Sequence, residues 1–300
     1  MKRKYIWIFI ILLAIYAVLS LSLPTDPQVL AKHNISQAKA HWLGLTITVP
    51  FVLIYLTALF GSVRVSNYAN SVKASKEGPH LRKLASGLLI LTFSLPIISI
   101  AKRILSYIAL NQPHLKPETT IIKNYLGLLL AFAAFYMIGR GARGLYATLK
   151  NPDLFKPSYF LLIGPIILAS VYTWLITAQN YNQQGQSAYF LPEWLVVTTL
   201  AIPYIFIWCI GLTAAYQIYK YKVNVKGSLY RHAFANLSAG MVFIVIVSVF
   251  IQLITTLSEQ FNRLNLTPLL GVVYLLLVLY AVGFGLVARG AQKLKKIEDV

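Results

Sequence analysis

The sequence predicts an all-α membrane protein in which eight transmembrane helices form two tandem four-helix repeats. Three observations lead to this prediction: an apolar composition, eight apolar stretches of spanning length and a partial internal duplication. Of the 300 residues, 58% are hydrophobic and 12% are charged, whereas a typical soluble domain has about 45–50% and about 25%. A soluble fold of this size needs more charge to cover its surface, so the composition argues against an ordinary soluble protein.

Eight apolar stretches are long enough to cross about 30 Å of hydrocarbon at about 1.5 Å per residue. We expect them to be helices, because lipid offers no partner for unpaired backbone groups and the alternating pattern of barrel strands is absent. The basic start and the apolar run after it resemble a signal peptide. That run is as long as a transmembrane helix, however, and Ser20-Leu21-Ser22 is a poor cleavage site, so we interpret it as a retained helix. The predicted spans are 5–23, 43–63, 84–101, 125–144, 159–179, 195–216, 237–257 and 269–288.

Basic residues are distributed unevenly between the two sides of these spans. The termini and the second, fourth and sixth loops hold 20 of the 27 Lys and Arg residues, and the other loops hold 7. The positive-inside rule therefore predicts a multi-pass protein of the plasma (cytoplasmic) membrane with both termini in the cytoplasm. We expect the basic face to attract anionic lipid headgroups. Nucleic acid is a poor partner for it, because the cations are spread over five short segments.

The chain repeats part of itself. Residues 50–100 match 203–253 at an offset of 153 with 10 identities in 51 positions, among them Pro50 with Pro203 and Gly87 with Gly240. A second block matches at an offset of 144. This predicts two repeats, residues 1–150 and 151–300. Each contains an even number of spans, so both enter the membrane the same way round, related by a pseudo-two-fold axis along the membrane normal.

The repeated residues have structural interpretations. Pro50 and Pro203 lie at mid-span, where proline kinks a helix and can open a cavity. Repeated glycines in the fourth and eighth spans would let helix backbones approach closely in lipid, and we expect the two spans to meet across the pseudo-axis. The glycines predicted to serve helix packing are Gly127, Gly139, Gly141, Gly271, Gly283 and Gly285.

Groups that could carry chemistry are scarce within the spans. Lys102 and Arg103 lie near the outer end of the third span and can reach the interface by snorkelling. If that helix continues through residues 104–110, they would lie at depth and could bind an anionic group. Polar uncharged side chains in the spans could form interhelical hydrogen bonds or line a small cavity. The candidate ligand or cavity residues are Pro50, Tyr55, Lys102, Arg103, Pro203, Trp208 and Gln252.

Motifs for catalysis, cofactors and metals are absent from the sequence. There is no nucleophile elbow, zinc-protease motif, Walker sequence or dinucleotide-binding glycine pattern. The one cysteine, Cys209, lies in an apolar run, and we expect a buried, unreactive thiol. The repeat brings His41 and Glu193 to related positions, where they could form an exposed pair. We therefore predict no enzymatic activity, no cofactor and no resident metal.

Two function classes remain open. The first is a non-enzymatic sensor, scaffold or subunit that packs against a membrane-protein partner or a second copy in the bilayer. The second is a small permease for a neutral or lipid-like substrate, with its path between the two repeats. Ion-coupled transport is disfavoured, because no intramembrane Asp or Glu is available to carry the coupling.

Overall fold

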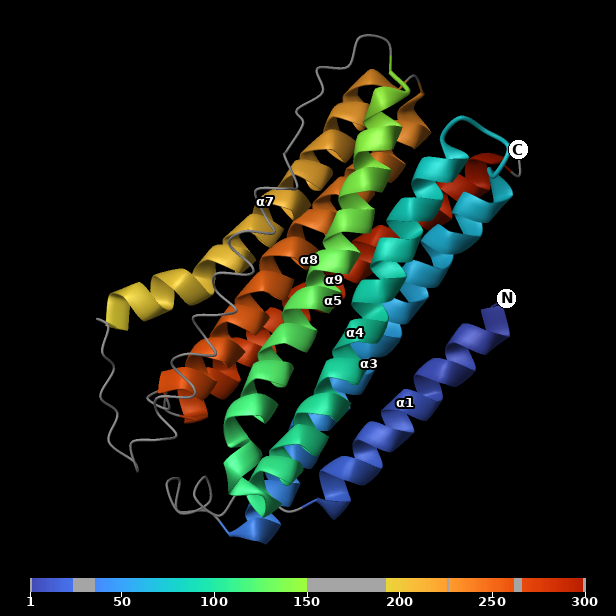
Figure 1. The fold of residues 1–300 in the computed structure, drawn as a ribbon. Helices are drawn as coiled ribbons and strands as arrows, with labels where there is room; N and C mark the ends of the chain where they lie inside the picture. Colours follow the sequence, from blue (N-terminus) through green and yellow to red (C-terminus); the bar gives the residue numbers. More distant parts are fainter. Residues whose placement is uncertain (1, 24–35, 150–192, 226, 262–265, 299–300) are drawn as a thin grey trace.

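The protein folds as a bundle of long helices (Figure 1). The structure is a computed structural model that describes residues 2–23, 36–149, 193–225, 227–261 and 266–298. All secondary structure in this part of the chain is helical, with a short 3-10 turn, η1 (Pro113–Leu115), between two of the helices. The α-helices are α1 (Lys2–Ser22), α3 (Gln37–Ser71), α4 (Gly78–Asn111), α5 (Lys116–Ala147), α7 (Glu193–Asn224), α8 (Ser228–Phe261) and α9 (Leu266–Glu298).

The chain is a polytopic helical membrane protein. Five of the described helices are long and apolar enough to cross a membrane, with spans at Phe51–Ser71, Gly78–Asn111, Leu126–Ala147, Tyr230–Ser248 and Tyr274–Lys296. In addition, α1 covers the predicted first span and α7 covers the predicted sixth. The predicted fifth span, 159–179, lies outside the described residues. The helices extend beyond the predicted edges: α4 has 34 residues and is therefore about 50 Å long.

Short polar turns connect the helices at one end of the bundle. After α3, Ser75 Oγ donates to the carbonyl of Val72 at 2.9 Å and accepts from the N–H of Gly78 at 3.1 Å. Between α7 and α8, Gly227 has a φ of 105°, a conformation that glycine adopts without steric cost. These turns hold neighbouring helices antiparallel and close together.

Six of the helices form a closed ring. In the order α3, α4, α5, α7, α8, α9, each helix packs against the next, and α9 packs back against α3. Helix α1 lies outside this ring, against α4 and α3, and Figure 1 shows it at the edge of the bundle. We refer to α1, α3, α4 and α5 as the first half and to α7, α8 and α9 as the second half. The two halves meet along α3–α9 and α5–α7.

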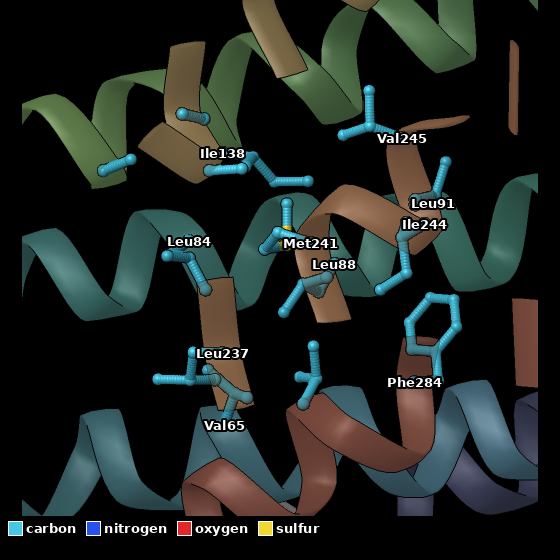
Figure 2. Packing of buried hydrophobic residues seen from close by; sticks show 14 of the residues in the cluster. Val65, Leu84, Leu88, Leu91, Ile138, Leu237, Met241, Ile244, Val245 and Phe284 are labelled. Atoms are coloured by element: carbon cyan, nitrogen blue, oxygen red, sulfur yellow. The ribbon is translucent and has the colours of Figure 1, made fainter. Parts of the chain in front are cut away.

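The centre of the ring is filled by apolar side chains from both halves (Figure 2). Leu84, Leu88 and Leu91 of α4 are at most 2% exposed, and Met241 and Ile244 of α8 are fully buried in the same cluster. The outward faces are also apolar, with Leu53, Leu129, Leu275 and Val278 among the exposed side chains. A bundle that is apolar inside and outside is suited to lipid, which solvates the outer face.

Candidate functional site

The interior between the two halves is the place where the sequence predicts a ligand or a transport path. Pro50 lies within α3, Pro203 within α7 and Gln252 within α8, but their side chains lie outside the part of the structure that is described. The same holds for the side chains of His41 and Glu193. The remaining candidates are Tyr55, Lys102, Arg103 and Trp208.

Tyr55 helps to dock α1 onto the ring. Its side chain is 1% exposed, and its ring contacts Phe9 of α1 edge-on, with centroids 6.3 Å apart at 86°. Phe9 also meets Phe93 of α4 at 5.7 Å, and Phe51 meets Tyr55 at 5.6 Å. Edge-to-face aromatic pairs contribute about 0.5–1.5 kcal/mol each beyond the area they bury. These contacts give Tyr55 a packing role.

Arg103 acts on the end of α1. Helix α4 does continue through residues 104–110, so Lys102 and Arg103 lie within the helix rather than at its end. Arg103 Nη2 donates to the carbonyls of Leu23 at 2.9 Å and Ser20 at 3.4 Å. These are the last carbonyls of α1, where a cation is favourable and where backbone acceptors have no intrahelical partner. Arg103 therefore caps α1, and Lys102 on the same turn is half-buried.

Trp208 lies on α7 and packs edge-on against Phe250 of α8, with ring centroids 6.3 Å apart. Its Nε1 is buried without a hydrogen-bond partner in the described structure. The second half contains two more buried hydroxyls. The hydroxyl of Tyr280 on α9 faces that of Ser248 on α8, yet neither oxygen makes a hydrogen bond of normal geometry in the described structure. These three groups are among the buried polar atoms that a cavity could use, beside His80 Nδ1, Arg103 Nε and Asn236 Nδ2.

A different polar contact joins α3 to α4. The hydroxyls of Ser62 and Thr92 lie 2.8 Å apart, both fully buried. Thr92 also donates to the carbonyl of Leu88 at 2.9 Å. In the second half, Ser238 of α8 donates to the carbonyl of Ala215 of α7 at 2.9 Å. Such interhelical bonds stabilise membrane bundles by about 0.6 kcal/mol each on average.

Glycines make close helix contacts at some of the predicted positions, but between other helices than the sequence suggested. A Cβ added to Gly141 of α5 would lie 2.6 Å from Leu84 N of α4, and one added to Gly283 of α9 would lie 3.0 Å from side chains of α8. A Cβ at Gly127 would lie 3.9 Å from Ile98, an ordinary contact. At Gly271 and Gly285 it would meet no described atom within 4 Å.

The contact predicted between the fourth and eighth spans is not a principal one. Those spans correspond to α5 and α9, whose main partners are α4 and α7 for α5, and α8 and α3 for α9. Sequence reasoning left several close-approach glycines out of the packing set, among them Gly87 and Gly290. A Cβ at Gly87 would lie 2.6 Å from Ala134 O, and one at Gly290 would lie 2.8 Å from Ala233 O. Gly87 and Gly240 match in the repeat, which was the available signal.

Cys209 corrects another expectation. The thiol was expected to be buried, but it is exposed on α7. The error has a physical reason: an apolar run in a membrane helix predicts burial from water, and both the lipid-facing and the inward faces satisfy that condition. Within the described residues, no group of three or more His, Cys, Asp or Glu side chains is arranged to hold a metal ion.

Comparisons with known proteins add no further assignment: no family model, no curated protein and no solved structure matches this chain.

Proposed function

We propose that the protein is a non-enzymatic membrane module, a sensor, scaffold or subunit that packs as a rigid unit against a membrane-protein partner or a second copy. The observation that carries the proposal is the packed apolar interior where a transport path would run. Leu88 and Met241, one from each half, are both fully buried in one continuous cluster. Protein interiors packed in this way leave few voids larger than a water molecule.

We further propose that the chain consists of two tandem four-helix repeats in parallel orientation. The ring of contacts supports this, because exchanging α3, α4 and α5 with α7, α8 and α9 turns each packing pair into another pair of the ring. Buried apolar residues support it too: at the offset of 153, Leu84, Leu88 and Leu91 correspond to Leu237, Met241 and Ile244, and all six are buried.

The glycine contacts favour a different register for the second block. Gly141 approaches Leu84 N and His80 O, and Gly290 approaches Leu237 N and Ala233 O. His80 and Leu84 correspond to Ala233 and Leu237 at the offset of 153, so Gly141 corresponds to Gly290, an offset of 149 rather than 144. At this offset, residues 125–145 have 9 identities with 274–294, among them Phe135 with Phe284 and Arg140 with Arg289.

The alternative is a small permease for a neutral or lipid-like substrate. Its support is a set of buried polar atoms without partners among the described residues, including Trp208 Nε1, Ser248 Oγ and Tyr280 Oη. Such atoms are costly in lipid and could serve a ligand that offers hydrogen bonds. Because apolar side chains from both halves, Leu88 and Met241 among them, fill the interior between the halves, we favour the module.

Cysteine accessibility separates the two functions without knowledge of a substrate. In a Cys209→Ser background, single variants Leu88→Cys and Met241→Cys are reconstituted in liposomes and treated with a water-soluble maleimide from each side. A packed module leaves both thiols unlabelled, while the matched control Lys295→Cys, at an exposed position, is labelled fully. Labelling of the two core thiols at a rate near that of the control would favour the permease.

We also propose that both termini lie in the cytoplasm of the plasma membrane, with the basic face against anionic headgroups. The support is the 20-to-7 division of Lys and Arg between the two sides. Reporter fusions test it: a cytoplasm-active reporter such as green fluorescent protein should be active at either terminus, and a periplasm-active phosphatase should not. Phosphatase activity at either end would overturn the orientation.

A further inference from the structure

Cations stack on aromatic rings at one end of the bundle. In each case the cation follows the ring by three or four residues, near the end of a helix that the charge distribution places on the cytoplasmic side. The pairs are Arg64 over Phe60 at 4.1 Å, Arg140 over Tyr136 at 5.8 Å, Lys220 over Tyr216 at 5.5 Å and Lys222 over Tyr219 at 4.8 Å. Two of the four lie together on the last turns of α7.

The end of α7 presents these lysines on an apolar surface. Tyr216 is 56% exposed, Tyr219 46% and Val223 50%, and their spacing places them on one face of the helix. The same face continues toward the membrane centre through Cys209 and Ile205, both exposed. The exposed surface therefore runs from an apolar strip to a pair of aromatic rings and then to two ammonium groups.

The neighbouring helix adds hydroxyl and cationic groups to this end. Helix α5 packs against α7, and the ends of the two helices lie side by side in Figure 1. The pKa of Lys220 is raised, first by its hydrogen bond with Tyr216 and to a smaller extent by Tyr146 of α5. On α5, Arg140 Nη1 donates to Tyr136 Oη at 3.1 Å. The lysine ammonium is therefore held in its charged form beside tyrosine hydroxyls.

We propose that the ends of α7 and α5 form a binding site for an anionic phospholipid of the cytoplasmic leaflet. Lys220 and Lys222 hold the phosphate, because an ammonium stacked on a ring still has N–H groups to donate. Tyr216 and Tyr219 lie at headgroup level, where aromatic rings with a polar tip are favoured. One acyl chain lies along the exposed apolar strip toward Ile205. A free phosphate ion would leave this strip uncovered. The proposal rests on the cytoplasmic orientation proposed above.

Charge complementarity favours this occupant over another protein chain. The predicted cytoplasmic side carries 20 basic residues against four acidic ones, and an anionic leaflet supplies the opposite charge at the same depth. Basic residues near such a surface contribute about 1 kcal/mol each, which corresponds to a change in affinity of about fivefold. Loss of both lysines should therefore weaken binding by about 30-fold.

Native mass spectrometry of the detergent-solubilised full chain tests the site. Wild type, Lys220→Gln/Lys222→Gln and the control Lys295→Gln/Lys296→Gln are titrated with phosphatidylglycerol, phosphatidylcholine and inorganic phosphate. The control removes the same charge from the exposed end of α9. We expect wild type and control to retain phosphatidylglycerol in preference to phosphatidylcholine, and the α7 variant to lose that preference by about 30-fold. Unchanged elution in gel filtration confirms that the variants are folded.

Three results would overturn the site. Equal retention of phosphatidylglycerol and phosphatidylcholine by wild type would mean that the protein does not recognise the negative charge of the headgroup. An equal loss in the α7 variant and the control would mean that the whole basic face acts without a site. Displacement of the lipid by inorganic phosphate at similar concentration would mean that the acyl chain contributes nothing. Binding in detergent depends neither on orientation nor on the packed core, so these failures are distinct from those of the proposed function.

Discussion

Replacing the glycines at the α4–α5 crossing with alanine should separate these two helices. A Cβ on Gly87 would lie 2.6 Å from Ala134 O and 2.8 Å from Ile138 N, and one on Gly141 would lie 2.6 Å from Leu84 N. Ordinary van der Waals contact begins at 3.4 Å, so each added methyl is about 0.8 Å too close. The atoms it meets belong to the helix backbone and cannot rotate away.

The expected cost follows from overpacking. Inserting a methyl group into a well-packed interior costs typically about 1–3 kcal/mol, and both glycines are buried. The better helix propensity of alanine recovers less than about 1 kcal/mol of this. We therefore expect Gly87→Ala and Gly141→Ala each to lower the free energy of unfolding by about 1–2 kcal/mol. Because both changes open the same crossing, the double variant should lose less than the sum.

Thermal unfolding in detergent, followed by gel filtration of the folded fraction, measures this cost. One kcal/mol lowers the midpoint by about 2–4 °C in a domain of roughly this size. Gly285→Ala is the matched control, because a Cβ there would meet no described atom within 4 Å. It should change stability by less than about 0.5 kcal/mol. If Gly87→Ala and Gly285→Ala had the same midpoint, the close crossing of α4 and α5 would be refuted.

Three further experiments test two other contacts and the position of one thiol. Ser62→Ala should lower the free energy of unfolding by about 0.6 kcal/mol. In a double-mutant cycle, adding Thr92→Val should cause no further loss. Full additivity of the two losses would mean that the 2.8 Å contact between the two hydroxyls contributes nothing. Arg103→Gln should lower the free energy of unfolding by about 1.5 kcal/mol, the low end for a charged hydrogen bond, because the site is partly exposed. Arg103→Lys should lose less, because it keeps the charge. Equal stability of wild type and both variants would exclude the cap on α1. The thiol of Cys209, exposed on α7, should react with N-ethylmaleimide while the protein is folded in detergent. A thiol that reacts only above the unfolding transition would lie inside the bundle instead.

The sequence predicted the helical spans of the described chain well, and its glycine pattern only in part. The length of an apolar stretch and the number of charges in a loop are local properties of the sequence. Spans such as 84–101 and 237–257 could therefore be located without knowledge of how the helices pack. The ends were underestimated, since α4 continues to Asn111 past Lys102 and Arg103. Those two cations could have marked a ligand site or an interface, and the contact of Arg103 with Leu23 O depends on where α1 lies.

The repeat illustrates the limit of matching letters in apolar helices. Identities between leucines or isoleucines arise by chance in such helices, and the offset of 144 aligns three pairs of glycines where the offset of 149 aligns one. The contacts of Gly141 with α4 and of Gly290 with α8, together with the 9 identities over residues 125–145, favour the offset of 149. The orientation of the termini and the two-repeat arrangement stay predictions.

By itself, the sequence determined that this protein is a multi-pass helical membrane protein, because hydrophobic length and composition are local properties of the chain. The tertiary structure decided which face of each helix is inside: Leu88 and Met241 point into the core, while Cys209 and Leu275 face outward. A helix that is apolar all round has no hydrophobic side to mark its partner, because lipid and protein interior solvate it about equally. In such a helix, close approach at glycine and single polar contacts determine the neighbours, and these are visible only once the helices are packed.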